Sequence, residues 1–367
     1  MERHELLVAY GDDPDSLLPR LFAAADLPAW LPRDRRIGIK PNLVVAKPSS
    51  SGATTDPRLV SALIAYLHAL GCRDLVILES SWLGDSTARA FRECGYEEIS
   101  QRTGVPLVDL KHDETVACEA HGLHVEVCRQ AREIGFLINL PVIKAHCQTR
   151  MTCALKNLKG CIPDAEKRRF HTLGLHRPIA VLNTILHTDL VIVDGIVGDL
   201  TFEEGGTPAR LDRIIVGRDP VLVDAYVASL MGFAPGDIPY IEMAAELGVG
   251  CRDLDRAGIR QINEPPVAPH SLEPVPCRLP ARVRADQACS ACLGSLRFAL
   301  RRLEEEDHAD RLSDEPICLG QGFRGQTQGG LGIGSCTAGF GRHLPGCPPA
   351  AADIVEFLRQ KPGKKIP

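Results

Sequence analysis

Stretches with strand-like and helix-like patterns alternate over residues 1–262 of the chain. Strands are predicted where apolar residues run without interruption, as in DLVILES (74–80), because a strand covered on both faces needs no polar alternation. Helices are predicted where apolar residues recur every three or four positions, as in PRLVSALIAYLHALG (57–71), with Asp56 as a candidate N-cap. The other predicted strands are 5–10, 35–44, 133–141, 189–198 and 213–220, and the other predicted helices are 86–95, 177–187 and 220–232. This alternation predicts an α/β domain with a largely parallel sheet and flanking helices.

The chain changes character after residue 262. Residues 263–280 contain six prolines in eighteen positions, a composition typical of an extended linker. Residues 281–367 contain five cysteines and several glycine-rich loops between short apolar stretches. We therefore expect a Pro-rich linker at 263–280 and a small, cysteine-rich α+β segment at 281–367.

Polar sequences follow five of the predicted strands. In a parallel sheet the carboxyl ends of the strands meet at one edge, where binding sites form. Turns are polar in any protein, so a single sequence of this kind carries little weight. Five of them together favour one shared cleft, and they are KPN (40–42), ESS (79–81), PVIKAH (141–146), DGIVGD (194–199) and GRDP (217–220).

Composition narrows the classes of function. The formal net charge of −5 gives no indication of a nucleic-acid-binding protein or of a polybasic membrane surface. No apolar run approaches the roughly 20 residues that span a bilayer. The first residues, MERHELLVAYGDD, lack the apolar core of a signal peptide, so a cytoplasmic location is expected.

Four of the fourteen cysteines form the most informative pattern in the chain. Without a secretory signal, metal binding is favoured over a disulfide scaffold. Cys289 and Cys292 form a C-x-x-C motif directly before an amphipathic helix, where backbone N–H groups and the helix dipole favour anionic ligands. Cys347 precedes two prolines and a predicted helix, and Cys336 lies in GIGSCTAG, where glycines allow close approach to a cluster. We expect these four thiols to bind a 4Fe–4S cluster.

Zinc is the alternative metal, because four cysteines also form structural zinc sites, often as two C-x-x-C pairs. Cys336 and Cys347 are eleven residues apart across a glycine-rich loop, and this spacing, with Pro348 directly after the last cysteine, favours the cluster. Cys318 is either an alternative ligand or a core residue. HLPGCPP (343–349) resembles the cluster loop of the small subunits of nickel–iron hydrogenases and of the cluster-bearing quinone-reductase subunit of respiratory complex I.

A basic segment interrupts this acidic chain. Residues 141–180 contain eight Lys or Arg, three His and two acidic residues, directly after a predicted buried strand. A charged run is often only a solvated face. Here LKNLKG (155–160) ends at a glycine and presents lysines and an asparagine together, which indicates a pocket for a carboxylate or a phosphate. His146, His171 and His176 are candidate proton carriers, although each could equally be structural.

These motifs together resemble the family catalogued as domain of unknown function 362. The resemblance runs in order through IKPNLV (39–44), residues 138–163, LVIVDGIVG (190–198) and residues 214–232, and its most specific elements are Lys-Asn-x-x-Gly and Gly-x-Asp-Pro. The sequence departs from the family at 199–211, which leaves Glu203 and Glu204 as doubtful members of the site. The resemblance implies a site made of Lys40, Asn42, Lys144, His146, Thr152, Lys156, Asn157, Asp194, Asp219 and Asp224.

Roles are assigned by residue chemistry within that set and to His171 of the basic segment. Asp224 has an equally good alternative role, which is to brace the helix after Pro220. We expect catalytic roles for Lys144, His146, Lys156 and His171. We expect substrate-binding roles for Lys40, Asn42, Thr152, Asn157, Asp194 and Asp219.

Three functions remain open at this stage. The first is an iron–sulfur redox enzyme or electron carrier that acts on an anionic small molecule or cofactor, or on a redox partner protein. The second is a lyase or isomerase that uses the cluster or a His/Lys pair, and the third is a non-enzymatic cluster scaffold. The chain contains neither G-x-G-x-x-G after its first strand nor G-x-x-x-x-G-K-[ST], so these nucleotide-binding motifs are not indicated. A homodimeric state is left open.

Overall fold

The computed structural model describes residues 1–201, 203–205, 207–234, 236–266, 279–305 and 315–360. The chain forms two compact units. The described residues of unit 1 are 1–167 and 175–266, and those of unit 2 are 168–174, 279–305 and 315–360. Most of the predicted linker, 267–278, lies outside the described residues, so the domain limits expected from the sequence stay a prediction.

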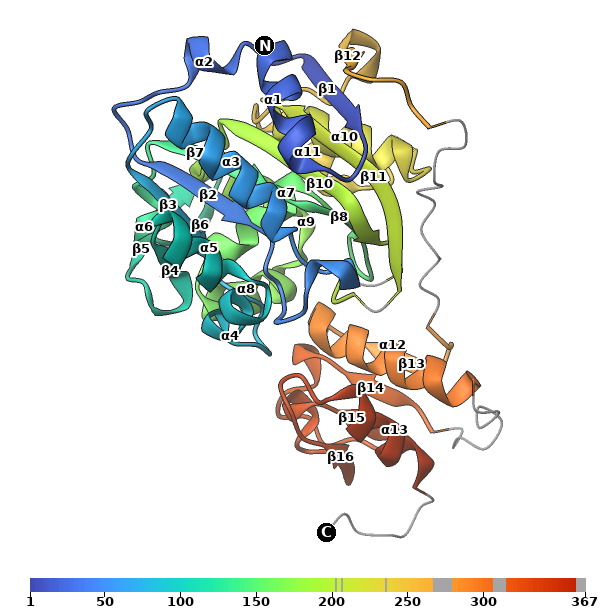
Figure 1. The fold of residues 1–367 in the computed structure, drawn as a ribbon. Helices are drawn as coiled ribbons and strands as arrows, with labels where there is room; N and C mark the ends of the chain where they lie inside the picture. The colour runs from blue at the N-terminus through green and yellow to red at the C-terminus, as the bar shows by residue number, and fades with distance from the viewer. Residues whose placement is uncertain (202, 206, 235, 267–278, 306–314, 361–367) are drawn as a thin grey trace. The chain divides into compact units, whose positions relative to one another are not determined.

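A ten-stranded sheet forms the centre of unit 1 among the described residues, with the order β12-β1-β11-β10-β7-β2-β3-β4 and with β8 and β9 attached to β10 (Figure 1). Its strands run parallel except at β11, which is antiparallel to both β1 and β10, and at β9, which is antiparallel to β8. The predicted α/β class with a largely parallel sheet is therefore confirmed. The strands are β1 (Glu5–Tyr10), β2 (Ile37–Pro41), β3 (Leu75–Glu79), β4 (Leu107–Asp109), β7 (Phe136–Leu140), β8 (Val142–His146), β9 (Arg150–Thr152), β10 (Leu190–Asp199), β11 (Pro208–Gly217) and β12 (Gly258–Gln261).

The direction of β11 corrects one expectation. Only residues 200–207 connect β10 to β11, and a parallel pair needs a crossover of a dozen or more residues. The two strands therefore form a hairpin, in which Gly217 pairs with Val191 at the beginning of β10. The GRDP sequence after β11 lies at the opposite edge of the sheet from the ends of the parallel strands, so the prediction that it shares their cleft is wrong.

Helices cover both faces of this sheet. On one face, α1 (Pro14–Ala24), α3 (Pro57–Ala69), α4 (Thr87–Glu93) and α5 (Tyr96–Thr103) pack a continuous apolar core against alternate residues of the strands, including Ile39, Ile77 and Ile138. On the other face, α7 (Ala154–Asn157) contacts β7 and α10 (Pro220–Leu230) contacts β10 and β11, and α9 (His176–Ile185) and α11 (Pro239–Glu246) pack on these helices. The strands are buried on both faces because helices cover both sides.

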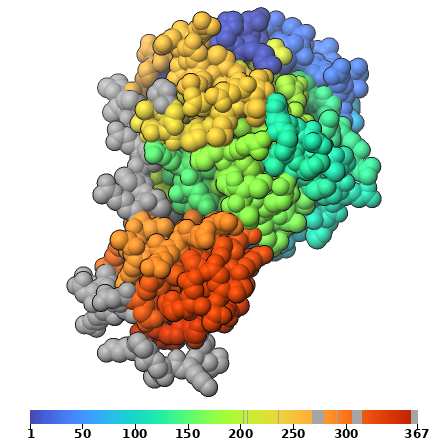
Figure 2. All heavy atoms as spheres, turned by 180° about the vertical axis from the view of Figure 1, so that it is seen from behind, coloured from blue at the N-terminus to red at the C-terminus, as the bar shows by residue number. Residues whose placement is uncertain are grey.

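Smaller elements complete unit 1. The short helices are α2 (Leu27–Trp30) and α6 (Arg129–Arg132), and a hairpin of β5 (Thr115–Ala120) and β6 (Leu123–Cys128) stands apart from the main sheet. Helix α8 (Asp164–Leu173) includes residues of both units. Figure 2 shows the gold atoms of the β12 region beside the blue atoms of the N-terminal strand, in agreement with the parallel pairing of β12 and β1.

Unit 2 contains, in its described part, a four-stranded sheet in the order β13-β14-β15-β16, with all neighbouring strands parallel. The strands are β13 (Val283–Ala285), β14 (Ile317–Leu319), β15 (Leu331–Ile333) and β16 (Arg342–Leu344). Helix α12 (Ser290–Glu305) follows β13, helix α13 (Ala351–Arg359) follows β16, and the two helices pack together. No helix among the described residues of either unit is long and apolar enough to cross a membrane.

Candidate functional sites

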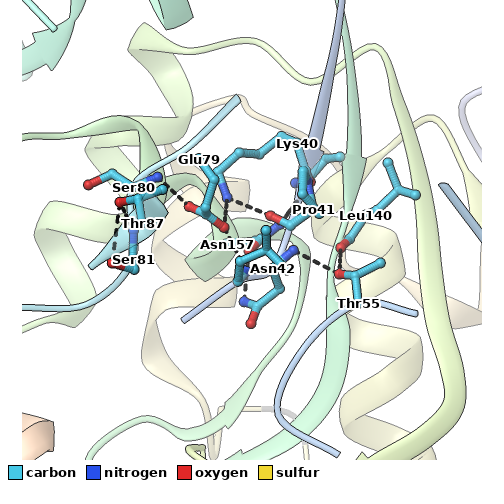
Figure 3. A network of polar contacts seen from close by, with 12 residues as sticks. Lys40, Pro41, Asn42, Thr55, Glu79, Ser80, Ser81, Thr87, Leu140 and Asn157 are labelled. Carbon is cyan, nitrogen blue, oxygen red and sulfur yellow. Dashed lines mark hydrogen bonds and ion pairs between the residues drawn. The ribbon is translucent and has the colours of Figure 1, made fainter. Parts of the chain in front are cut away.

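A buried ion pair joins the ends of β2 and β3 in unit 1. Lys40 Nζ lies 2.9 Å from Glu79 Oε2, and both side chains are at most 3% exposed. Lys40 also donates to the carbonyl of Pro41 at 2.7 Å, while Glu79 accepts from the backbone N–H groups of Leu43 and Ser80 at 2.8 and 2.7 Å (Figure 3). A buried charge is tolerated only when it is paired and hydrogen-bonded. Lys40, a predicted binding residue, meets this condition through partners inside the protein.

Three asparagines form a chain of hydrogen bonds beside this pair. Asn42 Nδ2 donates to Asn157 Oδ1 at 2.8 Å, and Asn157 Nδ2 donates to Asn139 Oδ1 at 2.7 Å (Figure 3). Asn139 Nδ2 in turn donates to the carbonyl of Ala154 at 2.9 Å. The Asn of the Lys-Asn-x-x-Gly motif thus connects α7 to β2 and β7, and its amide is fully engaged within the protein.

Lys144 continues this series of hydrogen bonds beyond Asn42. Its Nζ donates to Asn42 Oδ1, to the carbonyl of Ala53 and to the carbonyl of Glu203, at 2.9, 2.7 and 3.0 Å. All three acceptors are neutral oxygens. Burial lowers the pKa of Lys144 to about 7, although the nearby carboxylates of Glu203 and Glu204 favour its charged form.

Glu203 brings together two of the predicted catalytic residues. Its Oε2 atom lies 2.6 Å from His146 Nε2, in a contact that is not aligned as a hydrogen bond, and accepts a hydrogen bond from Lys156 Nζ at 3.1 Å. Lys156 also donates to the predicted residue Thr152 at 3.0 Å. The backbone N–H groups of Gln148 and Thr149 donate to His146 Nδ1, so the proton of the neutral ring is on Nε2, facing the carboxylate.

The pKa values of the two neighbouring glutamates are shifted in opposite directions. Burial raises the pKa of Glu203, but the effects of His146 and Lys156 outweigh it and hold that pKa well below its usual range. Burial and the charge of Glu203 raise the pKa of Glu204 well above its usual range. Burial also lowers the pKa of His146 to about 4. At neutral pH the cluster therefore contains an ionised Glu203 beside a neutral His146, while burial and the charge of Glu203 favour the protonated form of Glu204, a combination suited to proton transfer.

The remaining predicted residues have structural contacts in the fold. Asp194 accepts from the N–H groups of Asp56 and Ile196, and Asp224 accepts from those of Ala154 and Leu155. Asp219 caps α10 by accepting from two N–H groups of its first turn, at the sheet edge opposite to Lys144. His171 is buried, in the part of α8 that belongs to unit 2. The functional roles expected for these residues stay predictions.

The sequence already contained a signal for the two glutamates that were not assigned to the site. Glu79 ends an otherwise apolar strand, and Glu203 lies in the segment that departs from the family pattern. An acidic residue at the end of a buried strand needs a partner, which is Lys40 for Glu79.

The four cysteines predicted to bind the cluster line one pocket in unit 2. Cys289 and Cys292 follow β13, Cys336 follows β15 and Cys347 follows β16. Because these strands are parallel, the loops after them meet at the same edge of the sheet. The loops of Cys336 and Cys347 are also joined directly, since the N–H of Ser335 donates to the carbonyl of Gly346 at 2.8 Å.

Gly334 lies close to one of the pocket thiols, whereas Cys318 lies outside the pocket lining. Gly334 has φ +89°, and a Cβ atom there would lie 3.8 Å from Cys292 Sγ. Cys318 is buried with Phe323 and Phe340 in a small apolar cluster, and burial raises the pKa of its thiol. Cys318 is not among the residues that line the pocket, which agrees with the core role considered for it.

In the part of the chain that the structure describes, no group of three or more His, Cys, Asp or Glu side chains is arranged to hold a single metal ion.

Comparison with known proteins identifies the family of unit 1. The model of the family described as Domain of unknown function (DUF362) matches residues 37–229, or 193 of the 367 residues. The chain belongs to the DUF362 family. The matched range contains Lys40, Glu79 and the Lys144–Glu203 cluster, whereas the four pocket cysteines lie beyond it.

Two further similarities were found for this DUF362 protein. The thylakoid-associated protein sll1697 of Synechocystis sp. (strain ATCC 27184 / PCC 6803 / Kazusa) is 25% identical over 230 residues, which cover 58% of this chain and 68% of that protein. The structure of the lactate racemase apoprotein from Thermoanaerobacterium thermosaccharolyticum aligns with a TM-score of 0.40 and 11% identity, covering 62% of this chain. The chain spans 57% of the length of that racemase chain.

The glycine of the DUF362 Lys-Asn-x-x-Gly motif yields a first prediction. A Cβ atom at Gly160 would lie 2.1 Å from Glu79 Oε1 and 2.6 Å from Lys40 Nζ. Gly160→Ala should therefore separate the buried ion pair and lower the free energy of unfolding by about 3 kcal/mol in urea titrations. Gly258→Ala is the matched control, since its Cβ would meet only Glu5 Cγ at 3.5 Å. Equal stability of the two variants would contradict this role of Gly160.

Lys144 yields a prediction about pH. Its pKa is lower in the folded chain than in the unfolded chain, so between about pH 7 and 10 the unfolded state binds more protons. The free energy of unfolding of the wild type should rise with pH in that window by up to about 1.4 kcal/mol per pH unit more steeply than that of Lys144→Met. Lys111→Met, which changes a lysine that binds the carbonyls of Trp82 and Asp85, should keep the wild-type slope. Parallel curves for the wild type and Lys144→Met, from denaturation at several pH values, would show that Lys144 keeps its charge.

Proposed function

We propose that this chain is an iron–sulfur protein in which Cys289, Cys292, Cys336 and Cys347 bind a 4Fe–4S cluster, and that it acts as a redox enzyme or electron carrier. The observation that supports this most directly is that four thiols, spread over residues 289–347, line one pocket at the carboxyl edge of a parallel sheet. Four cysteine thiolates are the usual ligand set of such a cluster.

The choice between cluster and zinc depends on the spacing of the thiols. Four sulfurs bound at about 2.3 Å to one tetrahedral zinc lie about 3.8 Å from one another. In a 4Fe–4S cluster each cysteine binds a different iron, so the sulfurs stand farther apart. The described thiols line one pocket, and the glycine-rich loop between Cys336 and Cys347 supports the cluster, with zinc as the alternative.

In this proposal the two units have different roles, with electron transfer in unit 2 and anion binding in unit 1. When bound, the cluster supplies one-electron transfer. In unit 1, Lys144 and Lys156 would bind and orient an anionic small molecule or cofactor, because their ammonium groups lie within one buried polar cluster. The neutral acceptors of Lys144 support this role, since an anion would stabilise its charged form better than they do.

A second candidate function is a lyase or isomerase reaction in unit 1. The contact of Glu203 with both His146 and Lys156 favours it, since an ionised carboxylate beside a neutral imidazole can move a proton at a carbon next to a substrate carboxylate. In that case the cluster would be structural or would serve as a Lewis acid. A non-enzymatic cluster scaffold is the third possibility considered, and no contact in unit 1 favours it specifically.

The cluster can be tested by chemical analysis of anaerobically purified protein. The wild type should contain about four iron and about four sulfide ions per chain, and reduction with dithionite should produce an electron paramagnetic resonance signal. Cys347→Ser should lose most of the iron, because one of four ligands is removed. Cys251→Ser, at an exposed cysteine of unit 1, should keep it. One zinc ion per chain without sulfide would contradict the proposal, and a full cluster that dithionite does not reduce would favour the second candidate.

Anion binding in unit 1 can be tested by thermal unfolding. Inorganic phosphate or acetate, compared with chloride at equal ionic strength, should raise the Tm of the wild type, because a ligand that binds only the folded state stabilises it. Lys144→Met should lose this increase. Lys111→Met should retain it, since Lys111 Nζ binds the carbonyls of Trp82 and Asp85 instead. An equal increase in the wild type and Lys144→Met would contradict anion binding at Lys144.

A further inference from the structure

The loop after β14 is the exception in the cysteine pocket. Cysteines that line the pocket follow β13, β15 and β16, whereas the loop after β14 contributes Gln321 and Arg324. This loop is short and ordered by backbone hydrogen bonds, since the N–H groups of Phe323 and Arg324 donate to the carbonyls of Gly320 and Gln321. Each strand of unit 2 thus contributes to the pocket, and one strand contributes nitrogen donors instead of sulfur.

These donors point at the thiols. Arg324 Nε donates to Cys336 Sγ at 3.4 Å, and Gln321 Nε2 donates to Cys289 Sγ at 3.9 Å. Arg324 also lines the same pocket as all four predicted ligands, so its guanidinium lies at the proposed cluster site. An arginine remains charged at every relevant pH.

The position of Gln321 and Arg324 is itself constrained. A Cβ atom at Gly322, which directly follows Gln321, would lie 2.1 Å from Asp286 Oδ2, and one at Gly320 would lie 1.9 Å from the carbonyl oxygen of Asp286. Only glycine fits this close approach of the loop to the residues that follow β13. The two donors are therefore held next to the Cys289 loop by the packing of the backbone.

Resting on the proposed function, we propose that the loop after β14 sets the reduction potential of the cluster, with Arg324 and Gln321 as positioning residues that donate N–H groups to the cysteine sulfurs. Four thiolates make the bound cluster anionic, and reduction adds one electron and hence one negative charge. A fixed positive charge and N–H donors stabilise the more negative form, which raises the potential. No bond to carbon is made or broken in this step, and the electron comes from dithionite in the experiment below.

The test is a potentiometric titration of the full-length, cluster-loaded protein, with electron paramagnetic resonance as the readout. Arg324→Gln should shift the midpoint to a more negative potential, so that the ratio of oxidised to reduced cluster at a fixed potential rises at least tenfold, which is about 59 mV for one electron. Gln321→Leu should shift it in the same direction by less, because its contact is longer and neutral. The difference between the wild type and Arg324→Gln should shrink at high salt, because Arg324 is exposed and its charge is screened.

Arg342→Gln is the matched control in the same unit. It removes one positive charge that pairs with Glu315 at 3.1 Å and is not among the residues lining the cysteine pocket, so its midpoint should equal that of the wild type. An unchanged or higher midpoint in Arg324→Gln overturns the proposal. If that variant does not retain iron, an unchanged or higher midpoint in Gln321→Leu overturns it instead.

The two proposals fail in different ways. Wild-type protein without iron and sulfide would overturn the cluster itself, and the role of the β14 loop with it. If the wild type contains a full, reducible cluster and both variants have the same midpoint potential as the wild type, the cluster assignment stands. Only the role of Arg324 and Gln321 is then overturned.

Discussion

The direction of parallel strands is the constraint on which both candidate sites depend. In unit 1, β2, β3, β7, β8 and β10 run parallel, so Lys40 meets Glu79 and Lys144 meets Asn42, although these residues are far apart in the sequence. In unit 2, the same rule gathers loops from four parallel strands at one pocket. Side chains at the carboxyl ends of neighbouring parallel strands lie close together, and the candidate site residues are therefore found there in both sheets. Reversal of a single strand, as in β11, places its end at the opposite edge.

The two candidate sites differ in how their polar groups are stabilised. Unit 1 buries lysines and glutamates together, and Lys40, Lys144 and Lys156 each donate to a carboxylate, an asparagine or a backbone carbonyl. Such a network is stable only if every member has its partners, which explains why glycine is needed at 160 and why three asparagines link the strands. Unit 2 instead places thiols in a pocket with glycine-rich walls and a neighbouring guanidinium, an environment suited to an anionic group.

Much of the fold could be predicted from local patterns. The strands at 5–10 and 74–80 and the helices at 57–71 and 220–232 match β1, β3, α3 and α10 closely, because strong apolar periodicity over a full element leaves few alternatives. Helix α5 and the β5–β6 hairpin were not predicted, because α5 contains few apolar residues and each strand of the hairpin is only six residues long. The reversed direction of β11 could have been inferred from its eight-residue connection to β10, but not from its composition.

The sequence by itself determined which elements form and which side chains have unusual chemistry, because apolar periodicity, cysteine spacing and basic clusters are local properties of the chain. It singled out Lys40, Lys144, His146 and Lys156 and the cysteines at 289, 292, 336 and 347. Only the tertiary structure decided their partners. Lys40 meets Glu79 across 39 residues, Lys156 meets Glu203 across 47, and Asn42 meets Asn157 across 115. The free energy of a buried charge depends on what lies within a few ångströms of it, and sequence separation does not encode that distance.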